Sequence, residues 1–155
     1  MHIGIILFSL SGHTRKVTLR LKENLTAAGH QVTLNILEPT TQASFTQAAD
    51  APLKVIPSID AFDALIFAVP VWGGGPATPF LTFLNQTPSL QGKPVACLVT
   101  GFFPAKWGCL QTIAKMSELA QSKSANIIGA ASVTWFSLTR RRQIQRTVDK
   151  LAALF

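Results

Sequence analysis

The sequence predicts a three-layer, doubly wound α/β domain spanning residues 1–155, with a five-stranded parallel sheet between two layers of helices. Short apolar, β-branched runs alternate with segments of helical spacing, and this alternation is typical of a parallel sheet. Hydrophobic residues make up 48% of the 155 residues and charged residues only 14%. That composition can fill a sizeable core, and the length is that of about one domain.

The first half of the chain supplies two strands and one clear helix. Residues 3–8 are continuously apolar, as expected of a strand that is covered on both faces. A helix is expected over about 13–28, before Gly29 ends it. Residues 31–37 alternate as a second strand. Residues 38–62 contain three prolines and little periodicity, so any helix there is expected to be short, irregular or absent.

The second half continues the alternation. Residues 64–69 form the expected third strand, which Pro70 should end, and Thr78 and Pro79 are expected to cap and open a short helix. The remaining elements are expected in the order strand, helix, strand and helix, at 95–99, 110 to about 121, 127 to about 133, and from about 139 onward.

The loops at the carboxyl ends of the strands are the expected ligand site, because doubly wound sheets bind ligands there. The loop after the first strand contains Ser9, Ser11, Gly12, His13 and Thr14. Hydroxyl groups, free backbone N–H groups and the helix dipole together suit a phosphate. An ordinary helix cap is the alternative. The loop lacks the Walker and GxGxxG patterns, so nucleotide hydrolysis and dinucleotide binding are weak readings.

The loop after the third strand contains Pro70, Val71, Trp72, Gly73 and Gly74. An exposed indole face there could stack on a planar ligand, and the glycines would let the backbone approach the ligand closely. The alternative is a flexible turn in which Trp72 covers the core.

The loop after the fourth strand contains Thr100, Gly101, Phe102 and Phe103, followed by Lys106. A second aromatic wall opposite the first would enclose a flat heterocycle. Alternatively, the two phenylalanines pack the following helix onto the sheet. Taken together, the three loops favour a flat, phosphorylated ligand.

These motifs resemble the flavodoxin family. The pattern Ser9-x-Ser11-Gly12-x-Thr14 resembles the family's signature for the phosphate of FMN, and Pro70-Val71-Trp72-Gly73 resembles its ring-binding loop. Thr100-Gly101 occupies the position of its last flavin-contacting loop. The resemblance implies the strand order 2-1-3-4-5 and one non-covalently bound FMN.

The resemblance also implies a role for each loop. The first loop would hold the phosphate through hydroxyl and amide groups. Trp72 would stack on or flank the ring, while Gly73 and Gly74 would place backbone beside the reactive N5 atom. Thr100, Gly101 and Phe102 would meet the pyrimidine edge or the other face of the ring, and Phe103 is included among the contacts of this loop.

The charge of the chain differs from that of acidic electron-carrier flavodoxins. The net charge is +7, and none of the seven acidic residues lies in the three loops. Such a balance favours anionic partners. Because reduced FMN tends to be anionic and no carboxylate opposes that charge, we expect a less negative two-electron potential. Arg140, Arg141 and Arg142 are either a solvated helix start or a contact for an anionic co-substrate.

The predicted function is an FMN-binding redox protein of the cytoplasm. It would act as an electron carrier for an acidic redox protein, or as an NAD(P)H-dependent oxidoreductase with a quinone-type acceptor. The rival hypothesis is a flavodoxin-like binding module without flavin, whose basic surface binds an anionic partner. The sequence contains no metal-ligand pattern, no specific nucleic-acid motif and no membrane-spanning run. It leaves the oligomeric state open.

Overall fold

The computed structural model describes residues 1–41 and 51–155, and their order in space confirms the predicted α/β fold. Five parallel strands lie in the order β2-β1-β3-β5-β6, which is the predicted order 2-1-3-4-5 when only these strands are counted. The strands are β1 (His2–Leu7), β2 (Gln31–Ile36), β3 (Ala64–Trp72), β5 (Pro94–Gly101) and β6 (Asn126–Thr134). The helices are α1 (His13–Ala27), α2 (Thr78–Gln86), α3 (Cys109–Ser122) and α4 (Arg140–Ala152), with a short 3-10 helix, η1 (Ala105–Trp107).

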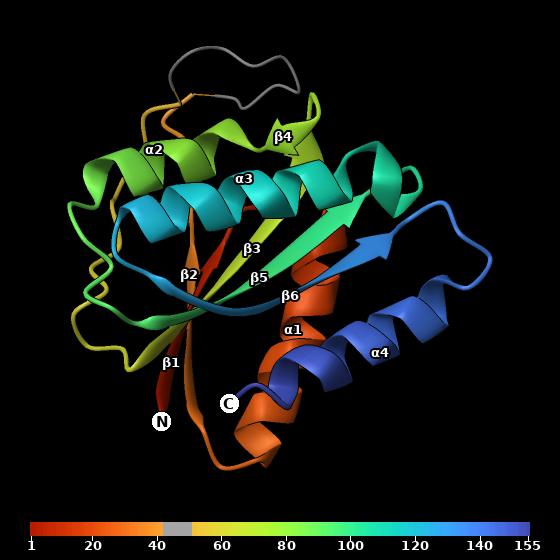
Figure 1. Ribbon diagram of the computed structural model, residues 1–155, viewed down its shortest axis with the longest axis horizontal. Coiled ribbons are helices and arrows are strands. Elements are labelled where there is room, and N and C mark those ends of the chain that lie inside the picture. The colour runs from red at the N-terminus through yellow and green to blue at the C-terminus, as the bar shows by residue number, and fades with distance from the viewer. Residues whose placement is uncertain (42–50) are drawn as a thin grey trace.

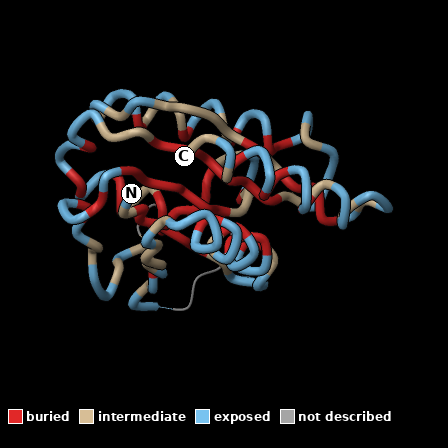
Figure 2. The backbone as a smooth tube through the Cα atoms, turned by 90° about the horizontal axis from the view of Figure 1, so that it is seen from below, coloured by how far each residue is buried: buried red, intermediate tan, exposed pale blue. Residues whose placement is uncertain are grey.

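The helices cover the sheet in two layers, with α2 and α3 on one face and α1 and α4 on the other (Figure 1). Successive residues of a strand point to opposite faces, so the central strands supply both apolar layers. Phe67 of β3 contacts Phe80 of α2, with ring centroids 5.0 Å apart, while the neighbouring Ile66 belongs to the cluster beneath α1 and α4. Figure 2 shows the buried residues concentrated between the layers.

The third strand continues to Trp72, so the prediction that Pro70 ends it is wrong. Pro70 pairs in register with Thr100 of β5. On the opposite side of β3, the backbone hydrogen bonds to β1 and the residue after it end at Ala68. The carbonyl of Ala68 accepts the last of these bonds from the Phe8 N–H. Residues two apart in a strand direct their backbone groups to the same side. The missing N–H of Pro70 therefore faces a side where β1 has ended, and the strand tolerates proline there.

A two-residue turn at Gly73 and Gly74 folds the end of β3 back into a short strand that the sequence did not predict, β4 (Gly75–Pro76). The two glycines have φ values of 56° and 81°. This is the left-handed pair that tight hairpins require and that glycine adopts without strain. The turn fixes where the backbone after Trp72 leaves the sheet.

One smaller prediction differs from the structure, and another agrees with it over the described residues. Thr78 is the first residue of α2 rather than its cap, because the carbonyl of Ala77 already accepts hydrogen bonds from the N–H groups of Phe80 and Leu81. Residues 38–41 and 51–62 contain no helix, in agreement with the prolines of this segment. The rest of that prediction, over 42–50, lies outside the described residues.

A methyl group added at Gly4 tests the packing of β1. A Cβ atom there would lie 2.3 Å from Cδ2 of Phe62, whose ring is buried. We expect Gly4→Ala to lower the free energy of unfolding by about 1–3 kcal/mol, measured by urea unfolding. In Gly129→Ala, the new Cβ would meet only the end of the Leu154 side chain near the C-terminus. That control should change stability by less than about 0.5 kcal/mol. Equal effects of the two substitutions would contradict this description of the core.

Candidate functional site

A pocket opens at the carboxyl edge of the sheet, between the chain segments that follow β1, β3 and β5. Eight of the predicted site residues line it together with Leu10 and Trp135: Ser11, His13, Pro70, Val71, Trp72, Thr100, Gly101 and Phe102. The structure therefore brings the three predicted loops to one place. The enclosed volume is only about 20 Å³, enough for about one water molecule. A flat ligand would have to lie across the mouth of the pocket or move its lining side chains.

The start of α1 presents free hydrogen-bond donors at this pocket. Gly12 precedes the helix with φ 87° and has no side chain to cap it. Ser9 Oγ accepts a hydrogen bond from the Arg15 N–H at 3.3 Å. Within the described part of the chain, the N–H groups of the four residues from Ser11 to Thr14 donate no hydrogen bond. These groups and the exposed Ser11 hydroxyl are available to an anion.

A buried hydrogen bond ties this helix start to the sheet. The hydroxyls of Thr14 and Thr100 lie 2.7 Å apart, and both side chains are almost completely buried. Thr18 Oγ1 donates to the Thr14 carbonyl at 2.8 Å. The hydroxyl of Thr14 therefore points into the protein, and its N–H is the group that faces the loop. The bond holds the first and third predicted loops at a fixed separation.

The aromatic residues of the predicted loops differ in exposure, because Trp72 is buried whereas Phe102 and Phe103 are exposed. Trp72 is only 3% exposed and packs edge-on against Phe8 at 5.0 Å, so it covers the core, as one of the two readings of its loop describes. Gly73 and Gly74 form the exposed hairpin turn and are not among the residues lining the pocket. Phe102 and Phe103 are exposed and do not pack α3 onto the sheet.

The anchoring of α3 comes from other residues. Its side chains that are buried against the sheet are Cys109, Thr112, Met116 and Ala120. Gly101 matters for this approach, because a Cβ atom there would lie 2.8 Å from the Cys109 sulfur. The short side chains at this point allow α3 to begin close to the end of β5.

A cluster of aromatic rings and a guanidinium borders the pocket, and sequence reasoning missed its central member. The ring of Trp135 stacks on His13 at 3.9 Å with an interplanar angle of 16°. The Arg140 guanidinium lies 4.7 Å from the Trp135 ring centroid and donates a hydrogen bond to the Trp135 carbonyl at 3.1 Å. Phe102 contacts His13 edge-on and stacks on Phe136 at 5.2 Å. The sequence feature that could have revealed Trp135 is the pair Trp135-Phe136, which lies shortly after the fifth predicted strand.

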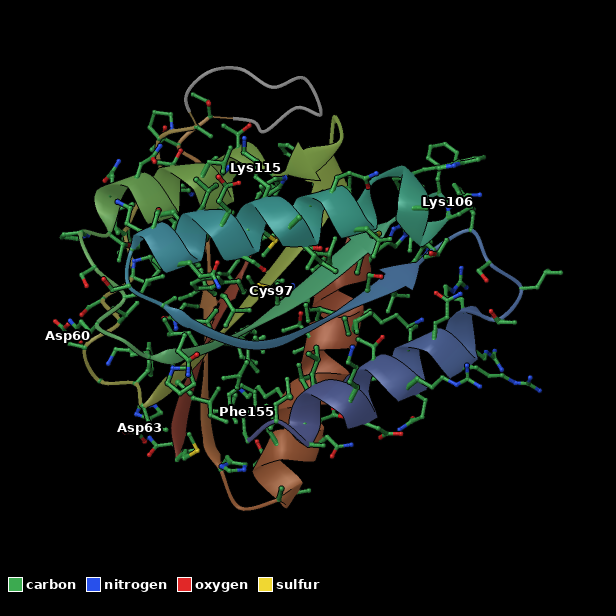
Figure 3. All side chains as sticks on the ribbon, viewed as in Figure 1. Asp60, Asp63, Cys97, Lys106, Lys115 and Phe155 are labelled. Atoms are coloured by element: carbon green, nitrogen blue, oxygen red, sulfur yellow. The ribbon has the colours of Figure 1, made fainter. Side chains whose placement is uncertain are left out.

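The electrostatic environment of this edge is positive. None of α1, α3 and α4, which all begin here, has an acidic residue in its first turn. Figure 3 shows Asp60 and Asp63 at the opposite end of the molecule from Lys106. Burial lowers the pKa of His13 below its usual value, and the Arg140 and Lys16 cations lower it further. The surroundings of His13 therefore disfavour its protonation.

The two cysteine residues are not nucleophiles of this site. Both are buried and free. Burial raises the pKa of the Cys97 thiol to about 12 and also raises that of Cys109. At Cys109 desolvation outweighs any favourable effect of the α3 dipole on the thiolate.

Two further features are absent from the described ranges. Residues 1–41 and 51–155 contain no group of three or more His, Cys, Asp or Glu residues arranged to hold a metal ion. Over the same residues, no helix is both long and apolar enough to cross a membrane.

The comparison with known families identifies the chain. The family described as NADPH-dependent FMN reductase matches residues 1–133. The chain belongs to this family. The match spans all three predicted loops, whereas Trp135, Phe136 and α4 lie beyond it. No curated protein sequence matches the chain.

Solved structures agree with this NADPH-dependent FMN reductase family member in fold. A flavoprotein from Lactobacillus acidophilus, solved in complex with FMN, is 19% identical with a TM-score of 0.67, covering 94% of this chain and 97% of its own. Flavodoxin 1 from Bacillus cereus is 16% identical with a TM-score of 0.70, covering 99% and 96%. The Trp repressor binding protein from Bacillus subtilis is 13% identical with a TM-score of 0.69, and the alignment covers both chains fully.

The lowered pKa of His13 predicts how the stability of this FMN reductase family member depends on pH. Because protonation of His13 is less favourable in the folded than in the unfolded state, its contribution to the free energy of unfolding is full above the unfolded pKa of about 6.5. That contribution is lost as the pH falls toward the lower folded value. Urea unfolding without phosphate or flavin should show a stability loss between about pH 7.5 and 5 that is smaller in His13→Gln.

The matched control for this series is Ser122→Ala, which removes no titratable group from an exposed position at the end of α3. It should leave the pH slope of the wild type unchanged. An identical slope in wild type and His13→Gln would show that His13 is not protonated less readily in the folded state.

Proposed function

We propose that this protein binds one FMN non-covalently at the carboxyl edge of the sheet and acts as an NAD(P)H-dependent oxidoreductase. The observation that carries the proposal is the set of free N–H groups from Ser11 to Thr14 at the start of α1. A phosphate ester is a dianion or monoanion near neutral pH. Free amide donors, the positive end of a helix dipole and the lack of acidic residues in the three loops all favour its binding there.

The residues of the cradle fit a phosphate group. Gly12 has φ 87°, and a Cβ built on it meets no atom within 4 Å, so the space in front of the helix start is open. Ser11 is exposed beside it and can donate a hydroxyl hydrogen bond. In this proposal Ser9 supports the loop from behind, because its hydroxyl already accepts the Arg15 N–H. His13 and Thr14 contribute backbone N–H groups.

The flavin ring would lie across the mouth of the pocket, between two backbone segments. Pro70, Val71 and the turn at Gly73 and Gly74 would flank one side, with Trp72 as the rigid apolar floor behind them. Thr100 and Gly101 would border the other side, and Phe102 would move from its contact with His13 to lie against the ring. Phe103 lies next to it in the same exposed loop.

The redox chemistry belongs to the cofactor, and the protein positions it. A bound FMN would supply the two-electron chemistry that connects NAD(P)H with a small acceptor of the quinone type. Arg141 and Arg142 are exposed in the first turn of α4, at the same edge as the pocket. Their charge would hold the phosphate groups of the dinucleotide. Arg140 is less available because it packs on Trp135.

Ser11→Ala tests the phosphate cradle. The substitution removes one donor to a charged group and should weaken FMN binding by about tenfold. The measurement is the quenching of FMN fluorescence on titration with the purified protein. Ser122→Ala is the matched control, because Ser122 is exposed at the far end of α3, and it should bind FMN like the wild type.

The same titration separates the rival functions. Wild-type protein that quenches no flavin fluorescence would refute the proposal and favour the flavin-free binding module. Equal FMN affinity in Ser11→Ala and wild type would remove the first loop from the site.

Arg141→Gln/Arg142→Gln tests the dinucleotide contact. With FMN bound, NADPH should bleach the flavin absorbance of the wild type under anaerobic conditions. The double variant should raise the apparent KM for NADPH by about tenfold while kcat changes little, because lost ground-state contacts act on binding. Arg20→Gln, in the middle of α1, is the control. An unchanged KM would place the dinucleotide elsewhere, and a flavin that neither NADH nor NADPH bleaches would favour an electron carrier.

A further inference from the structure

Five large apolar side chains are exposed beside the pocket in two neighbouring loops. We define the loop-tip patch by these residues and their exposed fractions: Phe102 36%, Phe103 62%, Trp107 65%, Phe136 73% and Leu138 108%. A few scattered apolar residues on a surface need no explanation, but a group of this size in one place does. Most of these side chains lie outside the residues that line the pocket.

Backbone contacts hold the two loops together. The N–H of Trp135 donates to the Gly101 carbonyl at 2.7 Å, and the N–H of Phe136 donates to the Phe102 carbonyl at 3.2 Å. The rings of Phe102 and Phe136 stack on each other. The two loops that carry the loop-tip patch are therefore held side by side. In Figure 1 the chain after β6 extends past the end of the sheet, at the side where α3 and α4 begin.

Cationic side chains border the loop-tip patch, and the chain segments that form it contain no acidic residue. Lys106 lies between Phe103 and Trp107 in the sequence, and the Lys106 ammonium is 5.7 Å from the Trp107 ring centroid. Arg141 and Arg142 follow shortly after Leu138 and Thr139. No acidic residue occurs from position 64 to 117 or from 119 to 148. The surface thus combines protruding aromatic and aliphatic groups with positive charge.

We propose that the loop-tip patch docks the protein on an anionic lipid bilayer, with the mouth of the pocket facing the membrane surface. Trp, Phe and Leu side chains enter the interfacial region of a bilayer, and Lys and Arg side chains beside them bind anionic headgroups. The lipid surface fits better than an acidic protein because Leu138 and its neighbours project from loop ends, which suits insertion into a yielding surface.

The docking itself does not depend on flavin, because the loop-tip patch is formed by the protein alone. The functional role of docking rests on the proposed function, because docking would bring the pocket to acceptors that dissolve in the lipid. The two ideas can fail separately, since vesicle binding and FMN binding are measured independently.

Vesicle flotation tests the proposal. Wild-type protein, with and without FMN, should float with phosphatidylcholine vesicles that contain about 30% phosphatidylglycerol, and not with pure phosphatidylcholine. Raising the salt concentration should weaken the binding without abolishing it at moderate ionic strength. Phe136→Ser/Leu138→Ser should lower the partition coefficient by about tenfold or more, and Arg141→Gln/Arg142→Gln by about tenfold.

Val55→Ser is the matched control for the loss of an exposed apolar side chain. Val55 is 73% exposed and precedes Ile56, which borders the C-terminal end of α2, so this variant should float like the wild type. Urea unfolding of each variant checks that the fold is kept.

Three outcomes would overturn the proposal. Wild-type protein that stays out of the anionic vesicle fraction has no lipid-docking surface, and the loop-tip patch would then be assigned to an acidic protein partner. Equal flotation with neutral and anionic vesicles would remove the role of the cations. Flotation unaffected by Phe136→Ser/Leu138→Ser would show charge binding without insertion of the loop-tip patch.

Discussion

The hydrogen bond between the buried hydroxyls of Thr14 and Thr100 sets the geometry on which the site depends. It joins the first turn of α1 to the end of β5, across the carboxyl edge of the sheet. With its hydroxyl committed inward, Thr14 leaves only its N–H for the loop, and the neighbouring N–H groups face the same opening. A neutral pair of this kind contributes only about 1 kcal/mol to stability. Its larger effect is on position, because it fixes the donors relative to the pocket.

The second constraint is electrostatic and arises from the order of the elements. Three helices begin at the carboxyl edge, so the positive ends of their dipoles lie there. The chain places no acidic residue in their first turns and adds Lys106 and three consecutive arginines. This arrangement disfavours cationic ligands at the edge and favours a phosphorylated one. Burial, together with the neighbouring Arg140 and Lys16 cations, also holds the pKa of His13 below its usual value.

Much of the fold followed from the sequence because the central strands β1, β3 and β5 contain nearly continuous apolar runs. The end of β3 was mispredicted at Pro70, because the cost of proline depends on whether a neighbouring strand needs its N–H, which the local sequence does not show. The turn at Gly73 and Gly74 was recognised as a turn, but its hairpin partner spans only two residues, too few to leave a pattern.

The meeting of the three loops at one edge was also predictable. The carboxyl ends of parallel strands meet at one edge, so the alternation of strands and helices along the chain was enough to group the three loops. Trp135 was missed because its stacking on His13 joins segments more than a hundred residues apart in sequence. The two environments of Trp72, core or ligand face, differ only in the direction of one side chain. Because the predicted strand ended at Pro70, sequence periodicity gave no prediction of that direction.

The central claim is that the start of α1 is a phosphate site, and comparison of FMN with riboflavin tests it most directly. The two ligands share the ring and differ in the phosphate, so their affinities isolate the contribution of the cradle. Calorimetric titration should give FMN an affinity at least about 100-fold higher than that of riboflavin. Equal affinities would show that the free N–H groups of the first loop bind no phosphate and would contradict the account.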